Sequence, residues 1–94
     1  MQFKDFETKE TKNPDGIQVL LDFGDYELSI VKNEMSYGNK QGLYEIAVFK
    51  GGDQVIMPGI TAEHDTVKGY LTTEEVDAII KKLYSATGTT PRQK

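Results

Sequence analysis

Hydrophobic and polar residues alternate regularly on both sides of Gly24-Asp25, from residue 17 to residue 30. A period of two is that of a strand with one buried face, and a two-residue loop that begins with Gly is a β-hairpin signal. Closing the chain at this turn puts the apolar side chains of both strands on one face, so that pattern and register agree. The paired positions are Phe23 with Tyr26, Leu21 with Leu28, and Val19 with Ile30.

The same pattern recurs around Gly51-Gly52 and predicts a second hairpin. Apolar residues alternate along the strand before this turn, and Pro58 ends the strand that follows it. The two-residue turn again brings the apolar side chains onto one face. The paired positions are Val48 with Val55 and Ile46 with Met57, and Tyr44 is next along that face.

The segment from Thr72 to Gly88 carries the signals of a single helix. Thr72 and Glu75 have the spacing of a capping box, and Gly88 suits the position just after the last turn. Between them, apolar residues recur three and four positions apart, which gives the helix one apolar stripe. The stripe consists of Val76, Ile79, Ile80, Leu83 and Tyr84.

These elements predict an α+β fold, a four-stranded antiparallel β-meander of two hairpins with one C-terminal helix packed on one face. A chain of 94 residues has room for one core. We expect a flexible charged N-terminal arm over residues 1–14, a single domain over 15–88 and a disordered tail over 89–94. Residues 59–71 form a long connector, and connectors of this length are often functional or mobile.

The face of the sheet that points away from the helix is not wholly polar. The arm, through Phe3 and Phe6, or a second copy in a homodimer would cover its apolar side chains. The functional interpretation is a surface for another protein partner. The apolar residues predicted on this face are Leu20, Val31, Leu43, Ala47, Phe49 and Ile56.

Composition argues against several classes of function. The sequence has no cysteine, which removes disulfides and zinc–thiolate sites and fits a reducing cytoplasm. Its net charge of −4 argues against direct binding of nucleic acid, which needs a basic footprint. No run approaches the ~18 apolar residues of a membrane span, so we expect no membrane partner.

Residue types that perform catalysis are sparse. Glu63-His64-Asp65 places three metal-ligand types side by side, but adjacent residues rarely converge on one ion, and the sequence has one histidine. An exposed loop histidine is the simpler interpretation. The serines have no base other than a distant His64, so a nucleophilic triad is not indicated. We therefore expect no enzyme, no catalytic residue, no metal site and no cofactor.

The connector from Ser36 to Tyr44 is the most distinctive segment of the chain. Its glycines permit positive φ and close approach of the backbone to a partner, and tyrosine is enriched at binding hot spots. By alternation Tyr44 faces the core, so Tyr37 is the better contact candidate; the alternative is a tight connector whose tyrosines pack against the hairpins. The candidate binding residues are Ser36, Tyr37, Gly38, Gly42 and Tyr44.

Several motifs between residues 17 and 84 resemble a widespread family of small uncharacterised proteins of tailed bacteriophages. The residues that carry the resemblance are Ser36-Tyr37-Gly38, Gly42-Leu43-Tyr44-Glu45 and the helix entry from Gly69 to Val76, Gly-Tyr-Leu-Thr-Thr-Glu-Glu-Val. The loop between the two glycines and the second return strand match the family less well. The resemblance implies a phage accessory protein that acts in the bacterial host cytoplasm.

Small phage proteins of this kind often modulate host factors, including defence systems. By this analogy, our leading hypothesis is a non-enzymatic protein that binds and modulates a host or phage protein. The alternative is a small-ligand or nucleotide-binding, sponge-like protein that uses the 36–44 loop. That loop lacks the Gly-Lys-Ser/Thr ending of a phosphate loop, and a strand rather than a helix is predicted after it.

Overall fold

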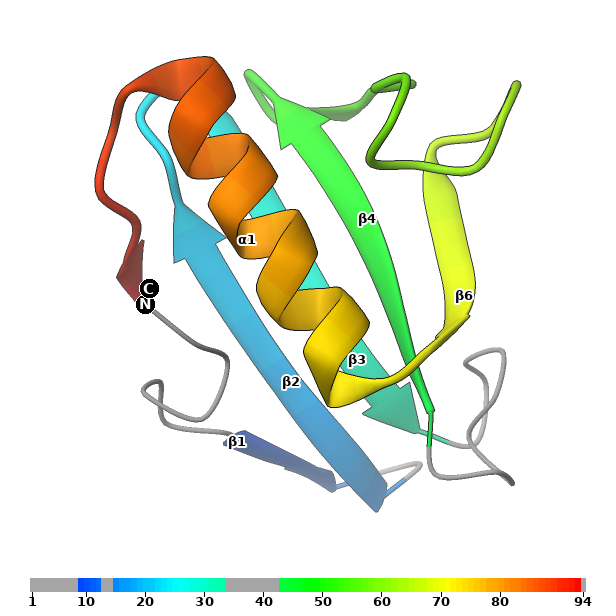
Figure 1. Ribbon diagram of the computed structural model, residues 1–94. Helices are drawn as coiled ribbons and strands as arrows, with labels where there is room; N and C mark the ends of the chain where they lie inside the picture. The colour runs from blue at the N-terminus through cyan, green and yellow to red at the C-terminus, as the bar shows by residue number, and fades with distance from the viewer. Residues whose placement is uncertain (1–8, 13–14, 34–42, 94) are drawn as a thin grey trace.

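The computed structural model describes residues 9–12, 15–33 and 43–93, and within them it confirms an α+β fold with one helix on one face of an antiparallel sheet. The sheet has seven strands in the order β1-β2-β3-β4-β5, with β6 also beside β4 and β7 also beside β2 (Figure 1). The elements are β1 (Lys9–Lys12), β2 (Asp15–Asp22), β3 (Tyr26–Asn33), β4 (Tyr44–Lys50), β5 (Asp53–Gln54), β6 (Val67–Leu71), α1 (Thr73–Thr87) and β7 (Arg92–Gln93).

The first predicted hairpin is confirmed, including its register. β2 pairs with β3 so that Val19 lies opposite Ile30 and Leu21 opposite Leu28. Gly24 has a φ of 90°, the positive value that a two-residue turn requires at its first position. Asp22 stabilises this turn, because its Oδ1 accepts a hydrogen bond of 2.7 Å from the Gly24 N–H.

The second hairpin is correct at its turn and in the register beside the turn, where Lys50 pairs with Asp53 and Phe49 with Gln54. β5 has two residues. The Val55 N–H donates to the Val48 carbonyl at 2.9 Å, and beyond Val55 the chain no longer pairs with β4. Ile46 then pairs with Lys68 of β6, not with Met57. The prediction of four strands is therefore wrong. The last long strand comes from the segment expected to be a connector.

Strand β6 was not predicted because hydrophobic and polar residues do not alternate regularly in this part of the chain. Gly69 lies in its middle, and Gly weakens a strand. The register also shifts, since two steps along β4 from Ile46 to Tyr44 correspond to three steps along β6 from Lys68 to Leu71. Such a β-bulge adds one residue and breaks the period of two that identifies a strand.

Helix α1 begins and ends where the capping residues predict. The Glu75 N–H donates to Thr72 Oγ1 at 3.2 Å, and Glu75 Oε1 accepts from the Thr72 N–H at 3.1 Å. Gly88 follows the last turn with a φ of 67°, and its N–H donates to the Tyr84 carbonyl at 2.8 Å. The buried stripe is narrower than predicted, because Tyr84 is 41% exposed.

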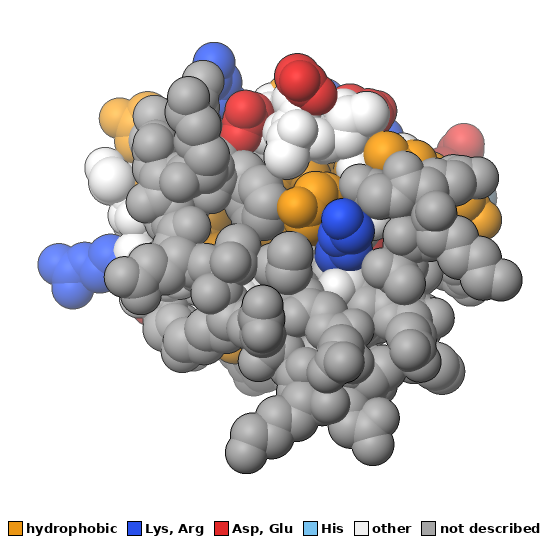
Figure 2. Space-filling model, turned by 90° about the horizontal axis from the view of Figure 1, so that it is seen from below, with side chains coloured by type: hydrophobic (Ala, Val, Ile, Leu, Met, Phe, Trp, Pro, Cys, Tyr) orange, Lys and Arg blue, Asp and Glu red, His pale blue; other side chains and the backbone are white. Residues whose placement is uncertain are grey.

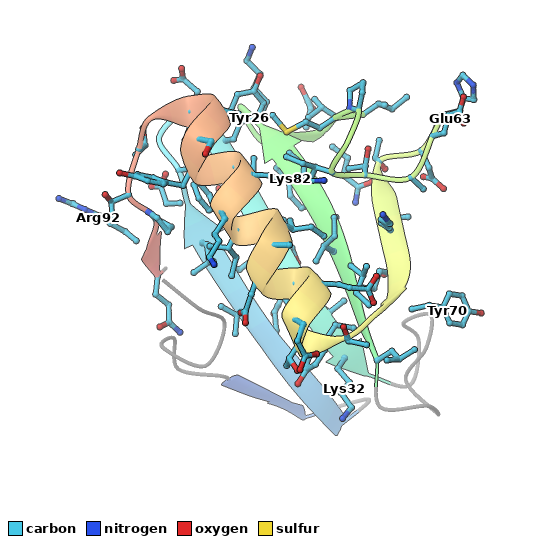
Figure 3. The ribbon with its side chains drawn as sticks, in the orientation of Figure 1. Tyr26, Lys32, Glu63, Tyr70, Lys82 and Arg92 are labelled. Atoms are coloured by element: carbon cyan, nitrogen blue, oxygen red, sulfur yellow. The ribbon has the colours of Figure 1, made fainter. Side chains whose placement is uncertain are left out.

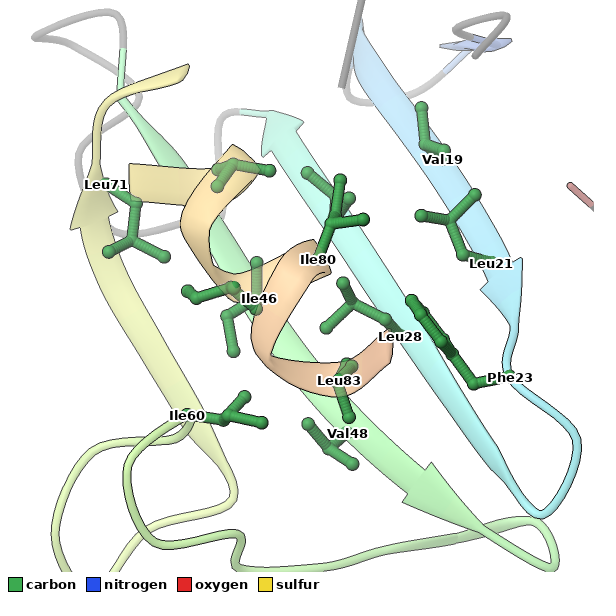
Figure 4. Close-up of a cluster of buried hydrophobic side chains, with 13 residues drawn as sticks. Val19, Leu21, Phe23, Leu28, Ile46, Val48, Ile60, Leu71, Ile80 and Leu83 are labelled. Atoms are coloured by element: carbon green, nitrogen blue, oxygen red, sulfur yellow. The ribbon is translucent and has the colours of Figure 1, made fainter. Parts of the chain in front are cut away.

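The core lies between α1 and the face of the sheet that it covers, where the helix runs roughly along the direction of β2, β3 and β4 (Figure 1). Figure 4 shows side chains of β2, β3 and β4 meeting those of α1, with Leu71 and Ile60 closing the side nearest β6. Full burial of one such side chain contributes roughly 1.5–3 kcal/mol. The core residues are Val19, Leu21, Phe23, Leu28, Ile30, Ile46, Val48, Ile60, Leu71, Val76, Ile79, Ile80 and Leu83.

Short strands also form where the sequence suggested an arm and a tail. β1 pairs with the first half of β2, and β7 pairs with Leu21 and Asp22 at the other end of the same strand. Pro91, just before β7, is buried. Residues 9–12 and 92–93 therefore belong to the sheet, in contrast to the division made from sequence.

The other face of the sheet carries the apolar row expected there. The register places Leu20, Ser29 and Ala47 side by side across β2, β3 and β4. The described apolar side chains of this face are half-buried, and Ser29 is buried. Ile56 does not belong to this face in the structure, because it lies in the loop after β5.

Candidate functional site at the β6 edge

Of the five binding residues predicted from sequence, Tyr44 falls within the described part of the chain. Ser36, Tyr37, Gly38 and Gly42 lie outside the described residues. Tyr44 is half-buried and packs against the core cluster, which agrees with its predicted orientation. The Lys32 Nζ lies 5.6 Å from the centroid of its ring, within the range of a cation–π interaction. Tyr44 is therefore a packing residue at the start of β4.

The loop between β5 and β6, residues 55–66, is anchored to the core. Ile60 is 4% exposed and points toward Val48 and Leu83 (Figure 4). The buried Thr61 Oγ1 accepts a hydrogen bond of 2.9 Å from the Met57 N–H and lies 3.2 Å from the Met57 carbonyl, to which it donates. These contacts close the loop into a defined shape, so that its surface is available without a large ordering cost.

A contact from the helix holds the same loop from outside. Lys82 reaches from α1 toward the loop (Figure 3), and its Nζ donates to the Gly59 carbonyl at 3.1 Å. Beside this contact the loop surrounds a hollow of about 500 Å³. Its lining is mostly apolar and includes Ile56, which is 53% exposed. The hollow is lined by Ile56, Pro58, Gly59, Thr61 and Ala62, with Glu63 and His64.

Two residues of this region have a backbone conformation that L-amino acids disfavour. Within the described ranges, His64 and Tyr70 are the residues other than glycine with positive φ, at 64° and 58°. The left-handed conformation costs roughly 1–2 kcal/mol per residue. His64 lies in a tight turn, in which the Asp65 N–H donates to the Ala62 carbonyl at 3.0 Å, and histidine is one of the side chains enriched at positive φ. A bulky tyrosine is a genuine outlier there.

Tyr70 occupies the β-bulge of β6. Its side chain is 58% exposed and projects away from the sheet (Figure 3), while the next residue, Leu71, is buried in the core. The bulge therefore allows Leu71 to reach the core while Tyr70 faces solvent. A glycine would meet the backbone requirement of this position at less cost.

The outer edge of β6 is poorly suited to pairing with another strand. At one end, the Ala62 N–H already donates to the Val67 carbonyl at 3.0 Å. At the other end, the left-handed Tyr70 interrupts the extended backbone. Bulges and charged residues such as the exposed Lys68 are common protections of a sheet edge. A partner at this edge would therefore meet side chains in preference to backbone groups.

Charges at this edge are arranged unevenly. Glu63 and Asp65 are exposed in the loop, where the Glu63 Oε1 lies 3.4 Å from the His64 Nε2. Lys68 is exposed on β6, two residues before Tyr70. In the view of Figure 2, described side chains of both charge signs are visible near hydrophobic ones. The loop therefore carries two exposed carboxylates, and β6 carries one exposed ammonium group.

A second, more polar hollow of about 420 Å³ lies at the tips of the two hairpins. Its lining includes Asp22, Glu27 and Phe49, and Lys50 also contributes. The Lys50 Nζ lies 5.3 Å from the centroid of the Tyr26 ring, in a cross-strand cation–π contact. This hollow exposes less apolar surface than the loop hollow does, so we treat it as the second candidate.

The described residues offer surfaces more clearly than reactive groups. In residues 9–12, 15–33 and 43–93, no cluster of three or more His, Cys, Asp or Glu side chains could hold a metal ion. Over the same ranges, no helix is long and apolar enough to cross a membrane. Comparisons with protein-family models, curated proteins and solved structures found no match to the chain.

From the sequence, the 36–44 connector ranks first as the binding site, and the 59–71 segment, which contains β6, ranks behind it. The signal in the sequence is weak, because Gly69-Tyr70 resembles an ordinary strand pair and the bulge depends on how Leu71 packs. Ile56 was placed on the wrong surface, since the return strand of the second hairpin ends earlier than predicted. The 59–71 segment was nevertheless recognised as unusually long.

Proposed function

We propose that this chain is a non-enzymatic binding protein that engages a host or phage protein. The contact surface consists of loop 55–66 and strand β6, here called the β6 surface. The phage setting comes from the resemblance of the Ser36–Gly38, Gly42–Glu45 and Gly69–Val76 motifs to small phage proteins. Modulation of a host factor, such as a defence protein in the host cytoplasm, is the role that this resemblance favours.

The observation that carries the proposal is the strained and exposed Tyr70. Its backbone conformation costs stability, and with 58% of the residue exposed much of its ring is accessible to a partner. Strain of this kind clusters at functional sites, and tyrosine is among the residues most enriched at binding hot spots. The exposed Ile56 and the anchored hollow add apolar area to the same surface.

Affinity capture with a tagged chain tests this proposal when a variant of the β6 surface is compared with a matched variant elsewhere on the protein. Tyr70→Ala removes the ring from the β6 surface, and Tyr84→Ala removes a ring of the same type that is 41% exposed on α1. We expect a protein captured by the parent to bind Tyr70→Ala at least tenfold more weakly, which corresponds to about 1.4 kcal/mol. Tyr84→Ala should bind at parent affinity.

Lysates from infected and uninfected bacteria separate a phage partner from a host partner. Tyr37→Ala should be included as well, because the sequence pointed to the 36–44 segment. If Tyr37→Ala loses the partner while Tyr70→Ala retains it, the proposed surface is wrong and the 36–44 connector is the binding site.

A small-ligand role remains the second candidate because of the loop hollow. Its volume of about 500 Å³ lies within the ~300–1,000 Å³ typical of ligand sites, and its lining is largely apolar. Native mass spectrometry of the chain purified from infected cells tests this role. A bound species of constant mass that is lost in Ala62→Trp, which fills the hollow, would support it. Bare protein would count against it.

A further inference from the structure

We infer that strand β6 has a second register, in which residues 67–69 move by one position along β4 and the extra residue of the bulge passes from Tyr70 into the turn at His64. β6 lies beside β4 at the edge of the sheet (Figure 1). The two registers present different side chains on each face of this edge, whichever protein or ligand the β6 surface binds. Three features of the edge support the second register: the side-chain pattern, the positions of strain and the contacts that hold the segment.

The observed register conflicts with the hydrophobic pattern of β6. Val67 lies opposite Ala47 and therefore on the face of the sheet away from α1. The exposed Lys68 lies opposite the buried Ile46, on the helix side. Leu71 is buried on that same side. Because Val67 and Leu71 are four residues apart, an unbroken strand would place both of them on the core face.

A shift of one residue removes this conflict. Leu71 keeps its partner in β4 and stays in the core. Without the bulge, Val67 comes to lie opposite the buried Val48, and Lys68 comes to lie opposite Ala47. Val67 then joins the core face and Lys68 leaves it, because a slip of one residue exchanges the faces of a strand. A strand with a glycine in its middle specifies its register weakly.

Strain lies at both ends of the segment that moves. Within the described ranges, His64 and Tyr70 are the residues other than glycine with positive φ, and they enclose residues 65–69. The shift changes both positions, since the bulge at Tyr70 disappears and the turn at His64 gains one residue. Strain at both ends lowers the advantage of the observed register over the second one. Residues held in such conformations cluster at elements that have two states.

Two contacts at the loop end of this segment are weak or exposed. The Val48 N–H donates to the Thr66 carbonyl at 3.5 Å, longer than the roughly 3.2 Å that bounds most such bonds. Thr66 Oγ1 donates to the exposed Gln54 Oε1 at 2.8 Å, a bond that water can replace. The shift also breaks the bond of 3.0 Å from the Ala62 N–H to the Val67 carbonyl. The observed register therefore remains the more populated one.

Engineered disulfides report the register, because the chain has no cysteine of its own. Ala47→Cys with Val67→Cys joins the observed partners, and Ala47→Cys with Lys68→Cys joins the partners of the second register. In the observed register, positions 47 and 68 point to opposite faces, so this pair cannot close. Ala47→Cys with Thr66→Cys is the matched control, because position 66 is displaced by one residue in the other direction.

Each double variant is equilibrated with reduced and oxidised glutathione at low protein concentration, and mass spectrometry gives the fraction with an internal disulfide. Circular dichroism of the reduced forms must show the parent fold. We expect the 47–67 pair to close most readily, and the 47–68 pair to close at least about tenfold more readily than the 47–66 pair, since a minor state of ~0.1–10% is enough to be trapped. A 47–68 pair that closes no more readily than the 47–66 pair overturns the inference, because fraying exposes both positions alike.

Tyr70→Gly, added to the 47–68 pair, tests the role of strain. Glycine adopts positive φ at little cost and weakens a regular strand, so this variant favours the observed register. Closure of the 47–68 pair should fall at least about fivefold, whereas Tyr84→Ala on α1 should leave it unchanged. Equal closure with and without Tyr70→Gly would overturn the inference. The proposed function is tested separately: if the 47–68 pair behaves like its control while Tyr70→Ala still loses a captured partner, the second register is wrong and partner binding stands.

Discussion

The two sides of strand β4 differ in how well the sequence explains them. Where α1 covers β2, β3 and β4, hydrophobic pattern, strand register and helix caps all lead to the same structure, and the side chains are buried. At the β6 edge, Tyr70 has a disfavoured backbone conformation, and both Tyr70 and Ile56 remain exposed. Local preferences agree with the fold in most of a protein and conflict with it mainly at functional sites. The β6 edge is therefore the better candidate for a functional surface.

The largest expected effect lies in the core. Ile80 is fully buried between α1 and the sheet. Ile80→Asp places an unpaired charge there, which costs several kcal/mol and should unfold the domain. Ala78→Asp, on the exposed side of the same helix, is the matched control and should melt within a few degrees of the parent. Cooperative melting of Ile80→Asp near the parent midpoint would contradict this packing.

A smaller loss is expected where the core meets the loop. Ile60→Ala removes the apolar anchor of residues 55–66, and truncation of a buried Ile to Ala costs about 2–5 kcal/mol. Chemical denaturation should show this decrease, while amide exchange in the loop should accelerate more than in β3. An unchanged exchange rate in the loop would mean that Ile60 does not hold it.

Thr61 tests the polar half of the same anchor. Its Oγ1 exchanges two hydrogen bonds with the backbone of Met57. Thr61→Val keeps the shape but leaves the Met57 N–H without this acceptor, which should cost about 1–3 kcal/mol. Thr66→Val is the control because its hydroxyl donates to the exposed Gln54 Oε1, and its loss should be within about 0.5 kcal/mol. Equal effects for the two variants would indicate that Thr61 has no special role.

Much of the fold was predictable because several independent signals coincided. The helix has a capping residue at each end, and the first hairpin has a turn signal together with a matched register. β6 was missed because Gly69 and the bulge at Tyr70 remove the alternation that identifies a strand. Its partner strand is also distant in sequence, so no local turn revealed the pairing. Propensity and pattern describe local preferences, and this strand depends on a long-range contact.

The candidate site was less predictable than the fold. A strained residue is recognisable only from its backbone angles. The residues around Tyr70 in the sequence do not indicate its positive φ. The 36–44 segment attracted attention because of its glycines and tyrosines, and Tyr44 proves to pack against the core. Aromatic residues indicate a binding surface only when the structure shows which of them remain exposed outside the core.

The most direct measurement compares Gly with Ala at position 70 and at position 78. Both variants at position 70 lack the ring, so their difference in free energy of unfolding reports the backbone alone. At a φ of 58° we expect Tyr70→Gly to be about 1 kcal/mol more stable than Tyr70→Ala. On the exposed face of α1 the sign should reverse, with Ala78→Gly about 1 kcal/mol less stable than the parent. If Tyr70→Gly is instead less stable than Tyr70→Ala, position 70 is not strained, and the reason for treating the β6 edge as a functional surface is lost.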